Sequence, residues 1–320
     1  MQPLAGLLVV DLTRHLPGPF ASRELLRLGA RVVRLEAPEG DPLRAIARQW
    51  DAALNAGKES VVCDLKAAPE LGRALCARAD IVLEGFRPGV AARLGVGPDD
   101  VPDRVVYCSL TGFGVDGRHA LRAGHDLNYL GWAGALADTA PALPPVQAAD
   151  LGAGALAAVA EILAALLERE RTGHGARLVI SMTHGSHRFV SHRVAGDPRP
   201  HLLTGGLACY RIYATADGRW LTVAALEAHF FEQLCTLLER PDLAPLHFAD
   251  DQQSLTDELA AIFATRTLAE WLELFDAEDV AVGPVATLAE AAVDLGTAEP
   301  PPPVSRLGQH TEEWRTELGF

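Results

Sequence analysis

Short apolar runs alternate with helix-like segments along the first 182 residues of the chain. The runs rich in Val, Leu and Ile are typical of buried strands, and they cover Leu7–Leu12, Arg31–Glu36, Ser60–Leu65, Ile81–Glu84, Val105–Leu110 and Arg177–Met182. Helical patterns lie between them, at Phe20–Leu28, Leu43–Ala53, Pro69–Ala79 and Gly152–Arg171. Strands that alternate with helices predict an α/β fold with a largely parallel, doubly wound sheet.

The pattern changes after residue 182. Residues 183–204 are rich in His, Arg, Pro and Gly, which is typical of a linker or an extended crossing segment. Two strands are expected within residues 210–225, around the turn at 216–219, and helices at 227–240, 255–264 and 268–275. A second, smaller α/β domain is therefore expected over residues 205–290, and the Pro-rich residues 291–302 form a second linker.

The longest apolar stretch, Gly152–Leu167, is about 16 residues long, whereas a membrane span needs roughly 20. Its many alanines favour a core helix, so no membrane association is expected. The N-terminus lacks the pattern of a signal peptide, and five scattered cysteines without a CxxC pair fit a reducing cytoplasm. These features indicate a cytoplasmic protein with buried thiols and no metal site.

The net charge of −14 is unevenly distributed. Residues 221–300 contain only Arg240 and Arg266 as cations against 16 acidic residues, and this segment repels polyanions such as nucleic acids. A ligand that carries phosphates is therefore expected on the N-terminal half. No GxGxxG motif follows the first strand, so a dinucleotide is not inferred.

Five side chains at strand ends or helix starts are candidates for chemistry or binding, each with a structural alternative. His125 lies downstream of a strand's carboxyl end, where it could act as a general base, and Asp150 could equally be a helix N-cap. Glu227 could stabilise a first helical turn, and Arg34 and Arg87 could bind phosphate or lie on the solvated surface.

Several short motifs, in order along the chain, resemble those of the family III CoA-transferases, a superfamily that includes α-methylacyl-CoA racemases. The matching segments include Asp11–Thr13, Pro17–Ala21, Gly40–Arg44, Asp64–Lys66, Glu84–Gly89 and Gly124–Tyr129. The resemblance runs from residue 4 to about 182 and from 203 to about 285. The segment Gly124–Tyr129 reads GHDLNY, as in the racemase branch, where many transferases have Tyr in place of the histidine.

The resemblance implies an enzyme of fatty acid metabolism that acts on an acyl-CoA thioester without a metal or redox cofactor. In the racemase reading, His125 and Asp150 exchange the α-proton of a 2-methylacyl-CoA and Glu227 supports the histidine. In the transferase reading, Asp150 is the nucleophile that passes CoA between carboxylic acids. A third reading is a non-catalytic CoA-binding paralogue. The residues expected to contact the CoA thioester are Arg34, Ser60, Val61, Val62, Cys63, Arg87, Gly124, Asp126, Leu127, Asn128 and Tyr129.

The family also implies an architecture. A Rossmann-like large domain of residues 1–182, completed by residues 303–320, is expected beside the small domain, in an interlocked homodimer. The active site would then lie between the large domain of one subunit and the small domain of the other. Compared with the family, Glu59 stands where an arginine is usual, an aspartate expected after the last strand is His184, and the closing segment looks shortened.

Overall fold

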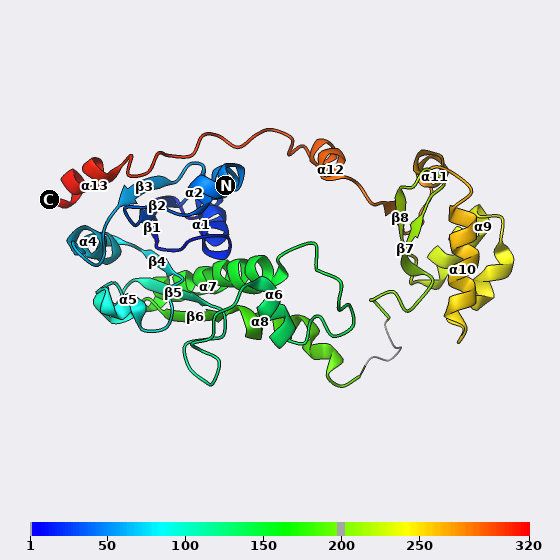
Figure 1. Cartoon of the computed structure of the whole chain (residues 1–320), viewed down its shortest axis with the longest axis horizontal. Coiled ribbons are helices and arrows are strands. Elements are labelled where there is room, and N and C mark those ends of the chain that lie inside the picture. The colour runs from blue at the N-terminus through cyan, green and yellow to red at the C-terminus, as the bar shows by residue number, and fades with distance from the viewer. Residues whose placement is uncertain (1, 197–201) are drawn as a thin grey trace. The chain divides into compact units, whose positions relative to one another are not determined.

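The computed structural model describes residues 2–196 and 202–320 and divides into two compact units (Figure 1). The large unit comprises residues 1–192 and 300–320, and the small unit comprises residues 193–299. The C-terminal segment of the chain thus belongs to the same unit as the N-terminal half. Each unit is described by itself below.

The large unit is built on six parallel strands, which confirms the predicted α/β class. They are β1 (Leu8–Asp11), β2 (Arg31–Glu36), β3 (Glu59–Val62), β4 (Ile81–Glu84), β5 (Val106–Thr111) and β6 (Arg177–Ser181). Their order in the sheet is β3-β2-β1-β4-β5-β6. After β1, the chain adds β2 and β3 on one side of it. It then adds β4, β5 and β6 on the other side, so the strand order reverses between β1 and β4.

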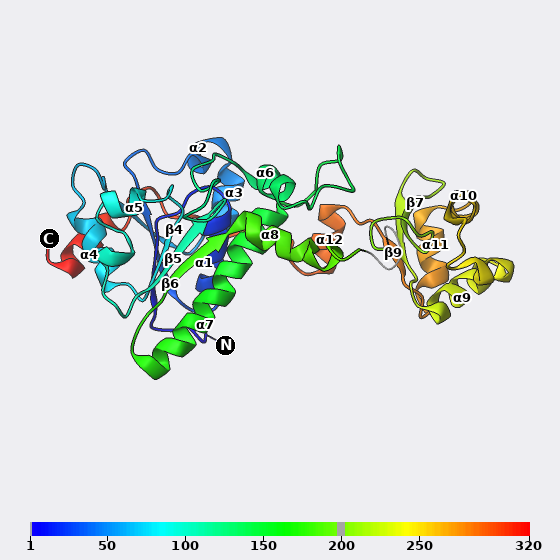
Figure 2. The same ribbon diagram turned by 90° about the horizontal axis from the view of Figure 1, so that it is seen from below.

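Helices cover both faces of this sheet (Figure 2). One core cluster joins the sheet to α1 (Pro17–Arg27) and α7 (Ala157–Thr172), and the other joins it to α4 (Glu70–Arg78) and α13 (Thr311–Leu318). The remaining helices of the unit are α2 (Leu43–Ile46), α3 (Arg48–Asn55), α5 (Val90–Arg93), α6 (Asp126–Trp132) and α8 (Met182–Val190), with short 3-10 turns at Pro98–Asp100 and Ser191–Arg193.

The alanine-rich segment is longer than the sequence suggested. A π-helical stretch, η2 (Ala149–Leu156), runs directly into α7, and together they form a 24-residue helix in which an 18-residue window has a mean hydropathy of 1.8. By length and composition this helix could cross a membrane, which corrects the prediction that the segment is too short to do so. Its inner side, with Ala155, Ala158 and Ile162, packs into the core of the large unit.

The expected linker begins later than predicted, because α8 occupies Met182–Val190. Ser181 caps this helix by accepting the backbone N–H of His184 at 3.3 Å. Gly185 lies against η2 so closely that an added Cβ would be 2.8 Å from the carbonyl oxygen of Ala153. Residues 197–201 of the expected linker lie outside the described residues.

The C-terminal segment packs along the edge strand β3. The backbone N–H of His310 donates to the carbonyl oxygen of Ser60 at 2.9 Å. Trp314 is completely buried, and its indole N–H donates to the Glu59 carboxylate at 2.6 Å. Arg31 pairs with the other oxygen of Glu59 at 2.7 Å and stacks on Trp314. Glu59, which stands where an arginine is usual in the family, therefore anchors the C-terminal helix α13 through Trp314.

We expect Trp314→Ala to lower the free energy of unfolding by about 3–5 kcal/mol, because the change leaves a cavity and removes the indole hydrogen bond to the Glu59 carboxylate. Urea denaturation monitored by circular dichroism measures this loss. Phe320→Ala, at a half-exposed side chain of the same segment, is the control and should change stability by less than about 1 kcal/mol. Similar losses for both variants would contradict a specific role of Trp314.

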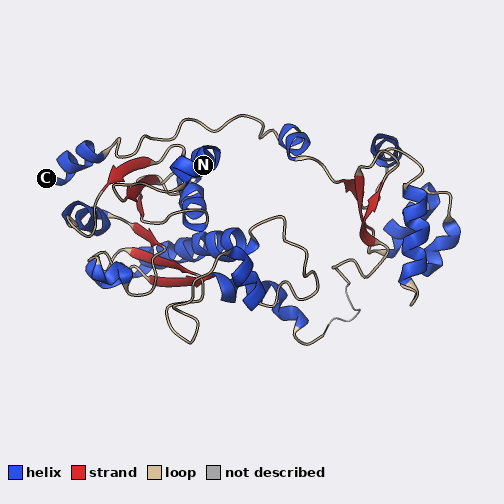
Figure 3. Cartoon of the chain, in the orientation of Figure 1, coloured by secondary structure: helices blue, strands red, loops and turns tan. Residues whose placement is uncertain are grey.

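The small unit contains an antiparallel sheet of β7 (Tyr210–Ala214), β8 (Trp220–Ala224) and β9 (Val282–Pro284) (Figure 3). One face of this sheet packs on α9 (Ala228–Leu237), α10 (Gln252–Phe263) and α11 (Leu268–Phe275) around a single core cluster. A 3-10 segment, Pro241–Leu246, and α12 (Leu288–Asp294) complete the unit. The strand pair and the three helices match the elements that the sequence predicts for residues 210–275.

Candidate active site

A cavity of about 250 Å³ opens at the carboxyl ends of the parallel strands. Its walls include residues that directly follow β1, β4 and β6, such as Thr13, Phe86 and Met182. This position includes the place where the strand order reverses, between β1 and β4. Ligands of doubly wound sheets bind at such a point, because the connections leave it in opposite directions and a crevice forms between them.

His125 and Asp150 line this cavity together. His125 is the N-cap residue of α6 and is exposed, and its backbone N–H donates to the side-chain oxygen of Asn128 at 3.1 Å. Asp150 lies in the first turn of the π-helical stretch η2. It is therefore not the simple α-helix N-cap that was the structural alternative. Widened helical turns of this kind occur frequently at functional sites.

The environment of Asp150 favours its neutral form. Burial raises the pKa of this carboxyl group to about 7, and the nearby charge of Asp126 adds to the effect. Asp126 is itself buried and does not line the cavity; its carboxylate accepts the backbone N–H of Asp150 at 2.9 Å. The structure thus places Asp126 behind Asp150, where it fixes the position of the π-helical turn.

Tyr129 fixes the loop that carries His125. Its hydroxyl group donates to the carbonyl oxygen of Gly124, and its ring lies so close to Gly124 and Gly112 that a Cβ at either would be 2.8 Å or 2.5 Å from a ring carbon. Tyr129 and Gly124 both line the cavity, and their contact with the substrate stays a prediction. Leu127 and Asn128 do not, since they are exposed on the other side of α6 beside Trp132.

A second cavity, of about 310 Å³, adjoins the first. Leu12, Thr13, Arg14 and Phe86 line both, and residues at the carboxyl ends of β2 and β3 complete the second one. Cys63, one of the predicted contacts, is part of this lining. Ser60, Val61 and Val62 are not, because Ser60 and Val61 are buried and Val62 packs against the C-terminal segment at Gly308.

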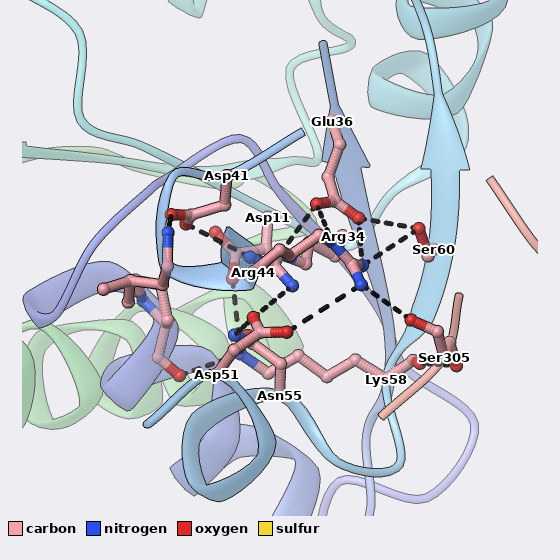
Figure 4. A network of polar contacts seen from close by, with 12 residues as sticks. Asp11, Arg34, Glu36, Asp41, Arg44, Asp51, Asn55, Lys58, Ser60 and Ser305 are labelled. Atoms are coloured by element: carbon pink, nitrogen blue, oxygen red, sulfur yellow. Dashed lines mark hydrogen bonds and ion pairs between the residues drawn. The ribbon is translucent and has the colours of Figure 1, made fainter. Parts of the chain in front are cut away.

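Arg34 does not reach either cavity, which corrects the prediction that it binds phosphate (Figure 4). Its guanidinium group is only 2% exposed and forms ion pairs with three carboxylates. They are Asp51 at 2.8 Å, Asp41 at 3.1 Å and Glu36 at 3.5 Å. A guanidinium group surrounded by buried acids has no free face for a ligand.

The network around Arg34 also contains Arg44 and Lys58. Arg44 pairs with Glu36 at 2.6 Å, and the ammonium group of Lys58 donates to the carbonyl oxygen of Pro19 at 2.8 Å and to Ser22. Burial lowers the pKa of Lys58 to about 8, although the charge of Asp11 opposes this shift. These contacts join the end of β1, the start of α1 and the end of β2, so they hold the walls of both cavities in place.

The exposed cations of the second cavity are Arg14 and Lys66, which the sequence reasoning did not single out. Arg14 comes shortly after β1, separated from it by Leu12 and Thr13, and Lys66 ends the Asp64–Lys66 motif. The position of each residue after a strand was therefore the signal that could have identified it. Arg87 is exposed and next to Phe86 but lines neither cavity, and its contact with phosphate stays a prediction.

Glu227 precedes α9 in the small unit, where it is exposed and forms no side-chain cap. The structure does not bring it together with His125 and Asp150 within one compact unit. Among residues 2–196 and 202–320, no three His, Cys, Asp or Glu side chains cluster in a way that could hold a metal ion.

Residues 4–300 match the sequence model of CoA-transferase family III. The chain belongs to this family. The human α-methylacyl-CoA racemase is 33% identical over 99% of this chain and 94% of its own length. A mouse succinyl-CoA:glutarate CoA-transferase is 30% identical over 90% of this chain and 73% of its own length. The relatives of this chain in family III therefore include both racemases and CoA-transferases.

Solved structures of the family share the fold. A CAIB/BAIF family protein from Brucella suis superimposes with a TM-score of 0.83 and 27% identity over 99% of both chains. The alignment with the human racemase spans 365 positions while this family III enzyme has 320 residues, so at least 45 of those positions are gaps in it. The family III chain described here thus lacks internal segments that the racemase has.

Proposed function

We propose that this family III enzyme racemises or epimerises a 2-methylacyl-CoA by moving the proton on the carbon next to the thioester. The observation that carries the proposal is that His125 and Asp150 line one cavity from two separate elements, α6 and η2. Inversion at that carbon requires one group to remove the proton and another to return a proton on the opposite face. Two titratable side chains on different elements fit this requirement.

The raised pKa of Asp150, about 7, suits this chemistry. A carboxyl group whose pKa lies near neutrality can hold a proton and also release it, and this is the property needed in a group that alternates between acid and base. The Tyr129 hydroxyl is committed to the carbonyl oxygen of Gly124, so Tyr129 orients the loop of His125 in this proposal.

The nucleotide part of CoA fits the second cavity in this proposal. The two cavities share Leu12, Thr13, Arg14 and Phe86, so a long ligand can extend from one to the other. Arg14 and Lys66 would contact the phosphates, because they are the exposed cations of the second lining. Coenzyme A then enters as part of the substrate, and no separate cofactor is needed.

Transfer of CoA between carboxylic acids is the second candidate, since Asp150 is positioned in the cavity for either reaction and several relatives carry transferase names. In that reaction the Asp150 carboxylate attacks the thioester carbonyl and expels the CoA thiolate. The resulting anhydride is reopened by the thiolate, which leaves an aspartyl-CoA thioester and a free acid.

One experiment separates the candidates. The enzyme is incubated with a 2-methylacyl-CoA in deuterated water, and the α-proton is followed by NMR with and without an added carboxylic acid. Exchange without an acceptor acid is expected. Transfer of CoA to the added acid without exchange would contradict racemisation and support the transferase. Binding of the thioester with neither reaction would support a non-catalytic paralogue.

We also propose that the chain forms the interlocked homodimer of its family, with Glu227 of one subunit near His125 of the other. The outer side of the helix Ala149–Thr172 supports self-association, because its exposed residues include an apolar stripe at helical spacing, which consists of Leu156, Ala160, Ala164 and Leu167. The mass of the protein in solution tests this proposal.

A further inference from the structure

His15 has an uncommon backbone conformation. Among the non-glycine residues that the structure describes, only His15 and Glu239 have a positive φ, and that of His15 is 67°. The left-handed region costs an L-residue roughly 1–2 kcal/mol. Residues persist there when their surroundings determine the conformation, and they cluster at ligand-binding and active sites.

Buried ionic groups hold His15 in this conformation. Its backbone N–H donates to the Asp41 carboxylate at 3.1 Å. The same carboxylate is paired with Arg34 at 3.1 Å and accepts the backbone N–H of Leu43 at 2.9 Å. Asp41 and Arg34 are both almost completely buried, and Figure 4 shows them side by side in the network. The backbone at His15 is thus held by a buried ion pair.

The His15 side chain lines the first cavity, the one that contains His125 and Asp150. It is exposed there, and its imidazole forms no hydrogen bond with any residue that the structure describes. Arg14, the preceding residue, lines the same wall. Two adjacent residues whose side chains can donate hydrogen bonds therefore line the space in which the proposed reaction takes place.

The charges around this cavity favour an anionic substituent. Its lining holds one permanent cation, Arg14, two imidazoles, and a single carboxyl group, Asp150, whose pKa is raised to about 7. No other carboxylate among the described residues lines the space. A second carboxylate on a substrate would therefore meet hydrogen-bond donors and little repulsion.

We propose that His15 contacts the substrate and selects acyl-CoA esters whose acyl group carries a second, free carboxylate. This inference rests on the acyl-CoA function proposed above and names its substrate class. The imidazole N–H donates to the free carboxylate, while Arg14, next to His15, faces the phosphates of CoA. The volume of the cavity, about 250 Å³, suits a short acyl group of this kind.

The test compares two esters of equal length that differ in charge, 2-methylglutaryl-CoA, with its thioester next to the methyl-bearing carbon, and 2-methylpentanoyl-CoA. Calorimetry gives Kd for each with the full-length wild-type protein, and the charged ester is expected to bind at least about tenfold more tightly, as one charge-assisted hydrogen bond provides. His15→Asn should reduce this preference by about tenfold or more, because asparagine tolerates the left-handed region but lacks the imidazole.

His15→Gly is the second variant, because glycine adopts a positive φ without strain and the protein should keep its stability. His15→Gly should lose the preference for the charged ester to the same extent as His15→Asn. Glu239→Asn changes the other residue with a positive φ, in the small unit, and should keep the wild-type preference. A preference that survives in both His15 variants, or that is absent from the wild type, would overturn this inference alone. Failure of both esters to bind would overturn the acyl-CoA function as well.

Discussion

His125→Ala is expected to slow exchange of the substrate α-proton with deuterated water by about 10²–10⁴-fold, the usual contribution of a positioned general acid or base. The loss should be in kcat rather than in binding of the CoA ester, because the nucleotide cavity is formed by other residues. NMR of the α-proton, run at several substrate concentrations, separates the two quantities.

The control for this variant is His174→Ala. His174 is also an exposed histidine, but it pairs with Asp103 at the opposite, amino-terminal end of β6 and lines neither cavity. The His174→Ala enzyme should exchange the α-proton of the substrate at the wild-type rate. A His125→Ala enzyme that kept full exchange would exclude His125 as one of the two proton-transfer groups, and would move the assignment toward the transferase, in which Asp150 alone is essential.

The sheet of the large unit could be predicted from the sequence because its strands are short runs of buried, largely β-branched residues. Arg31–Glu36 and Ile81–Glu84 begin and end as expected. Helix α8 could not be predicted from the sequence, because it contains Gly185 and several polar residues that are unfavourable in a helix by themselves. What stabilises it is the Ser181 cap and the close packing of Gly185 on Ala153, a contact between segments more than 30 residues apart.

The candidate site was predictable to the extent that it resides in contiguous motifs. His125 and Tyr129 share one hexapeptide, and the structure puts both in the cavity wall. The role of Arg34 was not predictable, because its partners Asp41 and Asp51 come from a connection whose path the local sequence does not specify. The same holds for Glu59, whose partner Trp314 is 255 residues away.

Asp150→Asn is the second variant with a large expected effect, since both candidate reactions need this carboxyl group. Asparagine neither exchanges a proton nor attacks a thioester, so proton exchange or CoA transfer should fall by about 10²–10⁴-fold. Asp116→Asn, at an exposed site outside both cavities, is the matched control and should keep the wild-type rate. Full activity in Asp150→Asn would exclude both mechanisms.

The pH dependence of the wild-type enzyme distinguishes the two reactions. A nucleophilic Asp150 must be ionised, so the rate of CoA transfer should rise through pH 7, the value to which burial raises its pKa, and then level off. Racemisation in the direction that begins with Asp150 as the proton donor needs the neutral carboxyl group, so its rate should fall as the pH rises through about 7.

The stability of Asp150→Asn should change in the opposite direction from its activity. The folded-state pKa of Asp150, about 7, lies above the unfolded value of about 3.9, so the folded state retains the proton while the unfolded state releases it. Wild-type stability is therefore lost as pH rises from about 4 to 7, by an amount on the order of 1–3 kcal/mol once partial exposure of the group to solvent is taken into account.

The asparagine of Asp150→Asn does not ionise, so the variant does not lose stability in this way. Urea denaturation should show the variant to be more stable than the wild type at pH 8, with the difference shrinking toward pH 4. An equal difference at both pH values would mean that it arises from packing and not from the ionisation that makes Asp150 suitable for catalysis.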